Sequence, residues 1–88
     1  MSWNEATDSA IERLRGEIEV ADEKYGPFTS AHEGYGVLAE EVDELLQAIR
    51  KNELLRIEHE ALQVAAVALR LRISMNEDAT RARSGCEE

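Results

Sequence analysis

The sequence of 88 residues contains few of the residues on which small disulfide-rich or β-rich domains depend. It has one cysteine, one proline and five glycines, and only 5 % of its residues are aromatic. Cys86 therefore has no partner for an intrachain disulfide, and so little turn-forming and aromatic material does not suit a β-sandwich. The composition favours long helices, and the absence of a disulfide pair is typical of a protein from a reducing compartment. We therefore predict an all-α, cytoplasmic protein.

A long apolar segment is also missing. The best candidate, residues 61–73, includes Gln63, Arg70 and Arg72, and it is shorter than the ~20 residues that cross a bilayer. We see no signal-peptide pattern at the N-terminus. The net charge of −9 repels nucleic-acid backbones and anionic lipids, so we expect neither nucleic acid nor membrane as a partner. A nucleotide can still bind an acidic protein when a divalent cation bridges the two.

Three segments have apolar residues three and four positions apart, which is the spacing of one helical face. They cover residues 4–25, 30–52 and 53–75, with Asn4 as the expected N-cap of the first helix. Ser30 and Glu33 form a capping box for the second helix. The expected core positions are Ile11, Leu14, Ile18, Ala21 and Tyr25 in the first segment, and Tyr35, Leu38, Val42, Leu45 and Ile49 in the second. Only residues 50–52 suggest a turn before the third segment, so one continuous helix is the alternative.

The third segment indicates that the chain does not act alone. Residues 61–69 are apolar except for Gln63, and a helix that is apolar nearly all round is buried on several sides. Three helices cannot easily bury it, and small domains often associate. We therefore predict a three-helix chain that forms a multi-helix bundle by homo-oligomerisation, as a homodimer or homotetramer. Residues 1–75 form the single domain, and residues 76–88 form a polar tail that frays or wraps a partner.

Three glutamates occupy positions that are otherwise apolar. Glu41 and Glu44 interrupt an edge of the second helix, and residues three apart on a helix have Cβ atoms roughly 5–6 Å apart. Glu60 is the one polar member of a stripe on the third helix, whose other residues are Ile57, Val64, Val67 and Leu71. If these two helices pack antiparallel, the three carboxylates can converge on a hard cation, for which Mg²⁺ and Mn²⁺ are suited.

A second interpretation of these glutamates stays open. Glu41 and Glu44 can be solvated residues at the edge of the core, paired with a basic residue of a neighbouring helix. Glu60 can likewise form a simple salt bridge, with Arg56 or with another basic side chain.

The same residues carry a resemblance to a known family. Glu41-Val-Asp-Glu44 and Glu60-Ala-Leu-Gln63 on consecutive helices, preceded by Tyr25-Gly-Pro-Phe28, resemble the MazG-like all-α nucleoside triphosphate pyrophosphohydrolases, in particular the small phage- and cassette-type members. The resemblance covers residues 25–71. It implies Mg²⁺-dependent hydrolysis of a nucleoside triphosphate to the monophosphate and pyrophosphate.

Carried over to this chain, the family pattern makes Glu41, Glu44 and Glu60 the catalytic metal ligands. Glu40 is a candidate helper beside these ligands. Gln63 stands where the family has an aspartate, so it would be a metal ligand that has no charge and cannot act as a base. A catalytically silent oligomerisation or nucleotide-binding module is therefore the alternative to an enzyme.

Five further residues are candidates for substrate binding: His32, Phe28, Tyr25, Lys24 and Arg56. The aromatic rings can stack on a base, His32 can contact a base or a phosphate, and the cations can contact phosphates. Core packing for the rings and simple solvent exposure for the polar residues are the alternatives.

Two other functional classes fit poorly. A di-iron carboxylate bundle needs Glu-x-x-His pairs, but the residues three positions before His32 and His59 are Thr29 and Arg56. A helix-turn-helix DNA-binding protein needs a basic recognition helix, which the acidic chain does not offer.

Overall fold

A computed structural model describes residues 2–86 of the chain, and the side chains of residues 2–77. The described part consists of three α-helices and contains no strand: α1 (Trp3–Tyr25), α2 (Ala31–Arg50) and α3 (Leu54–Cys86). The prediction of an all-α chain with three helices is confirmed. Within these residues, no helix combines the length and the apolar character that crossing a membrane requires.

The helix starts follow from side-chain capping. The cap of α1 is Ser2, whose Oγ accepts a hydrogen bond from the Glu5 backbone N–H at 3.2 Å, so the prediction of Asn4 was wrong by two residues. The capping box of α2 is confirmed in its first half, since Glu33 N–H donates to Ser30 Oγ at 3.0 Å. The Glu33 carboxylate accepts from the backbone and the hydroxyl of Thr29 instead of from Ser30.

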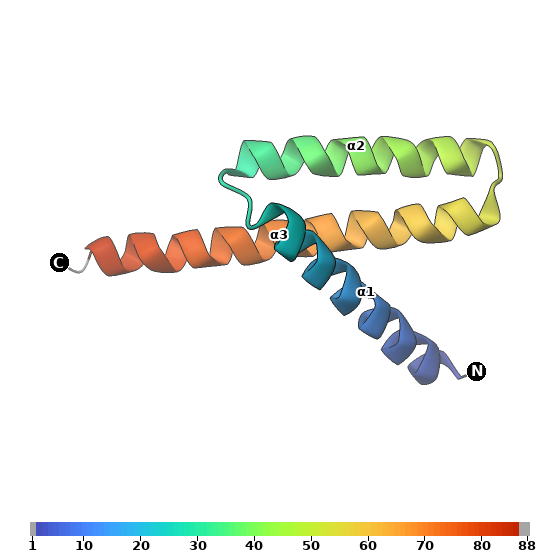
Figure 1. The fold of residues 1–88 in the computed structure, drawn as a ribbon, viewed down its shortest axis with the longest axis horizontal. Helices are drawn as coiled ribbons and strands as arrows, with labels where there is room; N and C mark the ends of the chain where they lie inside the picture. The colour runs from blue at the N-terminus through green and yellow to red at the C-terminus, as the bar shows by residue number, and fades with distance from the viewer. Residues whose placement is uncertain (1, 87–88) are drawn as a thin grey trace.

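A tight turn separates α2 from α3. Glu53 N–H donates to Ala48 O at 3.1 Å and Asn52 N–H donates to Ile49 O at 3.0 Å, which is the bond pair of a Schellman motif. Asn52 occupies the left-handed position with φ 54°. The chain therefore reverses direction without glycine or proline, and α2 lies antiparallel to α3 (Figure 1). The alternative of one continuous helix is excluded.

The third helix is longer than the sequence analysis predicted. It continues to Cys86, whereas we expected it to end at residue 75 and be followed by an irregular polar tail. Residues 76–84 contain neither glycine nor proline, and alanine and arginine are good helix formers, so nothing in the sequence stops the helix. The last two residues of the expected tail lie outside the described residues.

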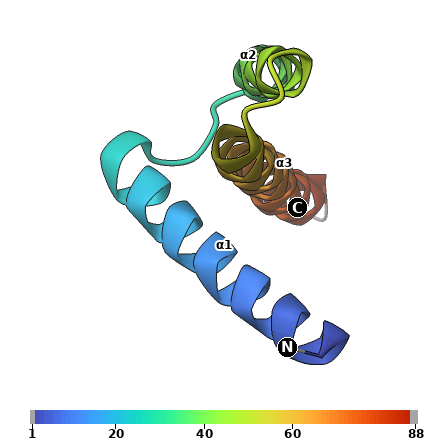
Figure 2. The same cartoon turned by 90° about the vertical axis from the view of Figure 1, so that its right-hand side faces the viewer.

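The three helices are not packed equally tightly. The α2 helix packs against the N-terminal part of α3 (Figure 1), whereas α1 contacts α3 but not α2 within the described residues. Figure 2 shows α1 leaving the helix pair at an angle. No residue of α1 is buried, and the buried apolar side chains among residues 2–77 are Phe28, Ala48, Ala66 and Val67. The core of a single chain is therefore small.

The prediction of the core face of α2 was partly wrong. Its buried residues are Gly34 and Ala48, whereas Tyr35, Val42 and Ile49 of the predicted stripe are exposed. The reason is close helix packing: a Cβ atom on Gly34 would lie 2.5 Å from Leu71 Cδ1, so the small residues of α2 face α3. On α1, Ile11 and Tyr25 of its predicted stripe are also exposed.

A buried arginine holds α1 and the following loop against α3. Arg70 is 6 % exposed, and its guanidinium donates to Asp22 Oδ1 at 3.0 Å and to Gly26 O at 2.8 Å. It also lies over the Phe28 ring, 4.6 Å from the centroid. Phe28 N–H in turn donates to Ser74 Oγ at 3.0 Å. These contacts fix the position from which α2 starts.

We expect Asn52→Ala to lower the free energy of unfolding by about 1 kcal/mol, because alanine adopts the left-handed conformation at a cost that asparagine and glycine largely avoid. Asn52→Gly is the matched control and should unfold at a midpoint close to that of the wild type. Urea denaturation followed by circular dichroism measures both. Equal midpoints for the alanine and glycine variants would show that this turn does not constrain the fold.

Candidate metal centre

Three carboxylates from two helices come together at the α2–α3 contact. Glu41 and Glu44 lie one turn apart on α2, and Glu60 lies on the antiparallel α3. One carboxylate oxygen of each lies within 4.8 Å of the other two. The convergence that we predicted from their spacing is therefore present in the fold.

Glu60 is the most unusual member of this carboxylate cluster. It is 8 % exposed, and its Oε2 atom is buried and has no hydrogen-bond partner. A buried charged oxygen without a partner costs several kcal/mol on the usual scale, so it requires a proton or a cation. The salt bridge considered as an alternative is not present, because Arg56 pairs with Glu53 at 3.5 Å instead. Among residues 2–77, no basic side chain forms an ion pair with any of the three glutamates.

Glu41 is close to both other glutamates of the cluster, and its surroundings disfavour its negative charge. Burial raises the pKa of the Glu41 carboxyl above its ordinary value, and the nearby carboxylates of Glu44, Glu60 and Glu40 raise this pKa further. No cationic side chain of the described residues offsets this repulsion. A divalent cation would reverse the effect, because it favours the ionised form of every carboxylate around it.

The donor set suits a hard cation. Mg²⁺ binds oxygen ligands at ~2.0–2.1 Å, so ligands on opposite sides of one ion are about 4.2 Å apart. The three glutamate oxygens lie within 4.8 Å of one another, so they would have to move closer together to bind one ion at these distances. Glu44 is exposed, so one side of the cluster is open to water and to phosphate oxygens. Mn²⁺ has the same ligand preference.

Gln63 has a specific partner that the sequence analysis missed. Its Nε2 donates to Glu17 Oε2 at 2.8 Å, in a partly buried contact between α3 and α1. With its amide nitrogen committed to Glu17, Gln63 can offer a cation only its Oε1 atom. Glu17 was detectable in principle, because it shares the apolar face of α1 with Leu14 and Ala21, at helical spacings of three and four.

A cleft of about 530 Å³ lies beside the cluster, between α1, the loop before α2, and the α2–α3 pair. Its walls include both members of the Glu17–Gln63 pair, together with Glu40 and Glu41. Of the predicted substrate-binding residues, Tyr25 and Phe28 line this cleft. Lys24, His32 and Arg56 do not line it, whereas Arg70 does.

The two aromatic residues of the cleft differ in what they can contact. Phe28 is buried and one face of its ring is covered by Arg70, so its packing role is established. Tyr25 is 68 % exposed, with Lys24 Nζ 5.2 Å from its ring centroid. Tyr25 is therefore the ring with surface available for stacking on a ligand.

Comparison with known proteins adds no further constraint: the chain matches no family model, no curated protein and no solved structure. The interpretation of this centre therefore depends on its own geometry and chemistry.

We expect the cation-free chain to become less stable as the pH rises through the raised pKa of Glu41. A raised carboxyl pKa means that the folded state binds the proton more tightly than the unfolded state does, so this stabilisation is complete below the ordinary pKa and is lost above the raised one. Added Mg²⁺ or Mn²⁺ should restore stability at neutral pH, by about 2.7 kcal/mol at one hundred times its Kd.

Thermal unfolding at about pH 7.5 and about pH 5, with and without the cation, measures this effect. The gain from the cation should shrink at the lower pH, where protons compete for the same oxygens. Glu41→Gln should remove both the pH effect and most of the cation effect, whereas Asp43→Asn, which lies between the two α2 ligands and contacts Gln47, should keep both. A cation effect that is unchanged in Glu41→Gln would rule out this site.

We also expect Gln63→Glu to lower the free energy of unfolding by about 1–3 kcal/mol in the absence of cations, because it removes a donor and places two carboxylates in contact. The double variant Glu17→Gln/Gln63→Glu exchanges donor and acceptor, so it should recover most of that loss. Urea unfolding of the wild type, of Glu17→Gln, of Gln63→Glu and of the double variant gives the coupling free energy between the two side chains. Additive effects would show that the two side chains do not interact in solution.

Proposed function

We propose that this chain is a Mg²⁺-dependent nucleoside triphosphate pyrophosphohydrolase of the MazG-like type, which releases pyrophosphate and the nucleoside monophosphate. The observation that carries the proposal is the buried Glu60 carboxylate beside Glu41 and Glu44, because its Oε2 atom has no hydrogen-bond partner. A single chain does not maintain three uncompensated carboxylates at a helix contact without a cost in stability. A cation that removes this cost would also attract a polyphosphate into a strongly acidic protein.

The cleft beside the cluster has room for the base and sugar of the proposed substrate. A volume of about 530 Å³ lies within the range of small-molecule sites. Its apolar wall, with Tyr25, Ala66 and Val67, suits a nucleobase, and the Glu17–Gln63 pair offers polar groups to a base or sugar. The phosphates would then extend toward Glu41, Glu44 and Glu60, so that the α-phosphorus lies at the carboxylate cluster.

In the proposed reaction, water attacks the α-phosphorus and the bond from that phosphorus to the bridging oxygen breaks, so pyrophosphate leaves with the bonding electrons. Mg²⁺, held by the three glutamates and by Gln63 Oε1, would neutralise the phosphate oxygens and the leaving group. The attacking water must lose a proton, and a carboxylate outside the ligand set can accept it. Glu40 lines the cleft beside Glu41 and is our candidate for that role.

The proposal includes two properties expected from the sequence: a cytoplasmic location and assembly into a homodimer or homotetramer. The exposed apolar residues of α2 (Tyr35, Val42 and Ile49) support the second, because they are available to another subunit.

A catalytically silent module is the second candidate, and one observation favours it. Gln63 brings no charge, and its amide nitrogen is engaged by Glu17. Such a protein would bind the cation and a nucleotide without hydrolysis. Its substrate-binding residues would be the same.

Pyrophosphate release from a panel of canonical and modified nucleoside triphosphates, with Mg²⁺ present, distinguishes the two candidates. Glu60→Gln and Glu41→Gln should each reduce kcat/KM by at least on the order of 10²-fold, since both remove charge that faces the transition state. Asp43→Asn is the matched control, with an exposed carboxylate on the same helix, and should keep wild-type turnover.

Wild-type protein that binds Mn²⁺ and a nucleotide but releases no pyrophosphate from any substrate would favour the silent module. Turnover that survives in Glu60→Gln would contradict the assignment of the centre, whatever the substrate. Circular dichroism of each variant confirms that a loss of turnover is not a loss of fold.

A further inference from the structure

The cleft beside the carboxylate cluster has a direction, which the helix contacts set. Gln63 of α3 contacts Glu17 of α1 at 2.8 Å. Further along, Arg70 contacts Asp22, so α1 and α3 run in the same direction past the cleft. With a rise of roughly 1.5 Å per residue, Gln63 lies about 4.5 Å from Glu60 along the axis of α3, and Arg70 lies about 15 Å from it. The Glu17–Gln63 pair is therefore the contact nearer to the cluster, and Arg70 lies toward the far end.

A nucleoside triphosphate has its own fixed order of groups. The sugar is joined directly to the α-phosphate, and the base is attached to the other side of the sugar. If the α-phosphate lies at the carboxylate cluster, as proposed above, the sugar lies beside the Glu17–Gln63 pair and the base lies beyond it, toward Tyr25. The β- and γ-phosphates then extend the other way, toward the exposed Glu44.

Glu17 has a carboxylate oxygen without a partner in the described part of the chain. Its carboxylate accepts one hydrogen bond there, from Gln63 Nε2 to Oε2, so Oε1 is open to another donor. Glu17 lines the cleft and is only partly exposed. An ionised carboxylate can only accept hydrogen bonds, and a phosphate group would repel it. The hydroxyl groups of the sugar are therefore the donors that fit this position.

The amide at position 63 makes this arrangement possible. The MazG-like pattern has an aspartate there, and two carboxylates in contact would repel each other. Gln63 instead donates through Nε2 and holds the Glu17 side chain in one position. A side chain that is already held in place loses less conformational entropy when it binds a ligand. The departure from the family pattern thus prepares Glu17 as an acceptor in the cleft.

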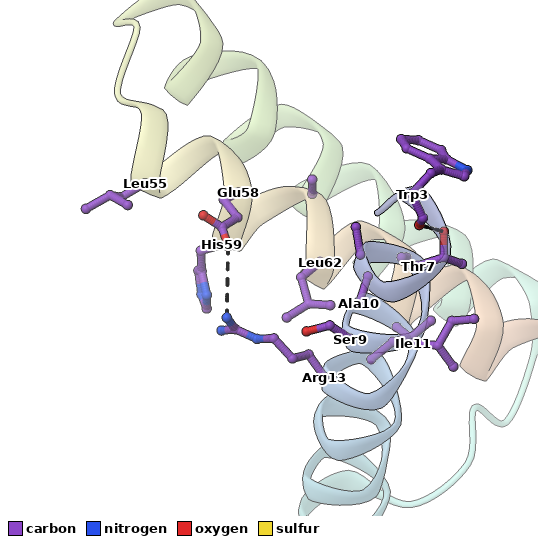
Figure 3. Close-up of a pocket in the computed structure, with 14 residues that line it drawn as sticks. Trp3, Thr7, Ser9, Ala10, Ile11, Arg13, Leu55, Glu58, His59 and Leu62 are labelled. Atoms are coloured by element: carbon purple, nitrogen blue, oxygen red, sulfur yellow. Dashed lines mark hydrogen bonds and ion pairs between the residues drawn. The ribbon is translucent and has the colours of Figure 1, made fainter. Parts of the chain in front are cut away.

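A second concave surface lies between the first halves of α1 and α3. This groove has a volume of about 850 Å³, but no residue of the carboxylate cluster lines it. Figure 3 shows Arg13 and Glu58 facing each other across the groove, where they form an ion pair of 3.9 Å. Its acidic group therefore already has a partner within the chain. A sugar whose phosphate is held at the cluster belongs in the cleft and not in this groove.

We infer that Glu17 determines the choice of sugar: its carboxylate accepts hydrogen bonds from the ribose 2′- and 3′-hydroxyls, so this chain prefers ribonucleoside triphosphates to their 2′-deoxy counterparts. The inference rests on the proposed function, because the α-phosphate must lie at the carboxylate cluster. The two hydroxyls are neighbours on one face of the ring, and a carboxylate has enough lone pairs for both. Loss of one hydrogen bond to a charged group weakens binding about 10- to 100-fold.

Analogues that cannot be cleaved test the choice of sugar without turnover. In α,β-methylene nucleoside triphosphates, carbon replaces the oxygen that bridges the α- and β-phosphorus. Isothermal titration calorimetry with Mg²⁺ gives the Kd of the ribose and of the 2′-deoxyribose analogue, for whichever common base binds most tightly. We expect the wild type to bind the ribose form about 10- to 100-fold more tightly. Glu17→Ala should bind both forms with nearly equal affinity.

Glu19→Ala is the matched control. Glu19 is an exposed glutamate of the same helix that does not line the cleft, so its substitution changes the net charge equally and should keep the sugar preference. The ratio of the two Kd values separates recognition of the sugar from damage to the fold, because a distorted cleft weakens the binding of both analogues. Circular dichroism verifies that each variant is helical.

Equal affinity of the wild type for both analogues, or tighter binding of the deoxy form, would overturn this inference and leave the proposed function standing, since a nucleotide would still bind. A ribose preference that survives in Glu17→Ala would overturn the assignment to Glu17. If neither analogue binds with Mg²⁺ or Mn²⁺ for any base, the proposed function itself is wrong, and the inference is wrong with it.

Discussion

Repulsion between three carboxylates at the α2–α3 contact is the constraint on which the rest of this structure depends. Gly34 and Ala48 permit the two helices to approach closely, and this approach holds Glu41 and Glu44 against Glu60. Burial and mutual repulsion raise the pKa of Glu41 and leave one Glu60 oxygen without a partner. The packing that stabilises the helix pair therefore also creates a demand for a positive charge, and this demand links the fold to a chemical role.

Arg70 is a buried charge with a structural role, and its partners all come from within the chain. Its guanidinium has a carboxylate, a carbonyl and an aromatic ring around it, so its charge is compensated within the chain. Glu60, almost three turns earlier on the same helix, has no such arrangement. The contrast between a compensated cation and an anion with an unpartnered oxygen distinguishes the part of α3 that holds α1 from the part that carries the proposed cation site.

Sequence reasoning identified the elements that local patterns determine. Helical spacing and the Ser30 cap predicted the helices, and the spacing of Glu41, Glu44 and Glu60 predicted their convergence. It did not identify which face of α2 packs inward, because α2 carries two apolar faces and hydrophobicity alone does not tell an internal contact from an external one. The Glu17–Gln63 and Asp22–Arg70 contacts join residues far apart in the sequence, so no local pattern could show them.

The tight turn at Asn52 has a consequence for how the chain folds. It joins α2 to α3 through very few residues, so bringing these helices together costs little loop-closure entropy. The contacts of α1 with α3 span more than forty positions, as in the hydrogen bond from Gln63 to Glu17, with a sequence separation of 46. Because contacts between residues close in sequence cost less entropy to form, we expect the hairpin that carries the carboxylate cluster to assemble before α1 docks onto it.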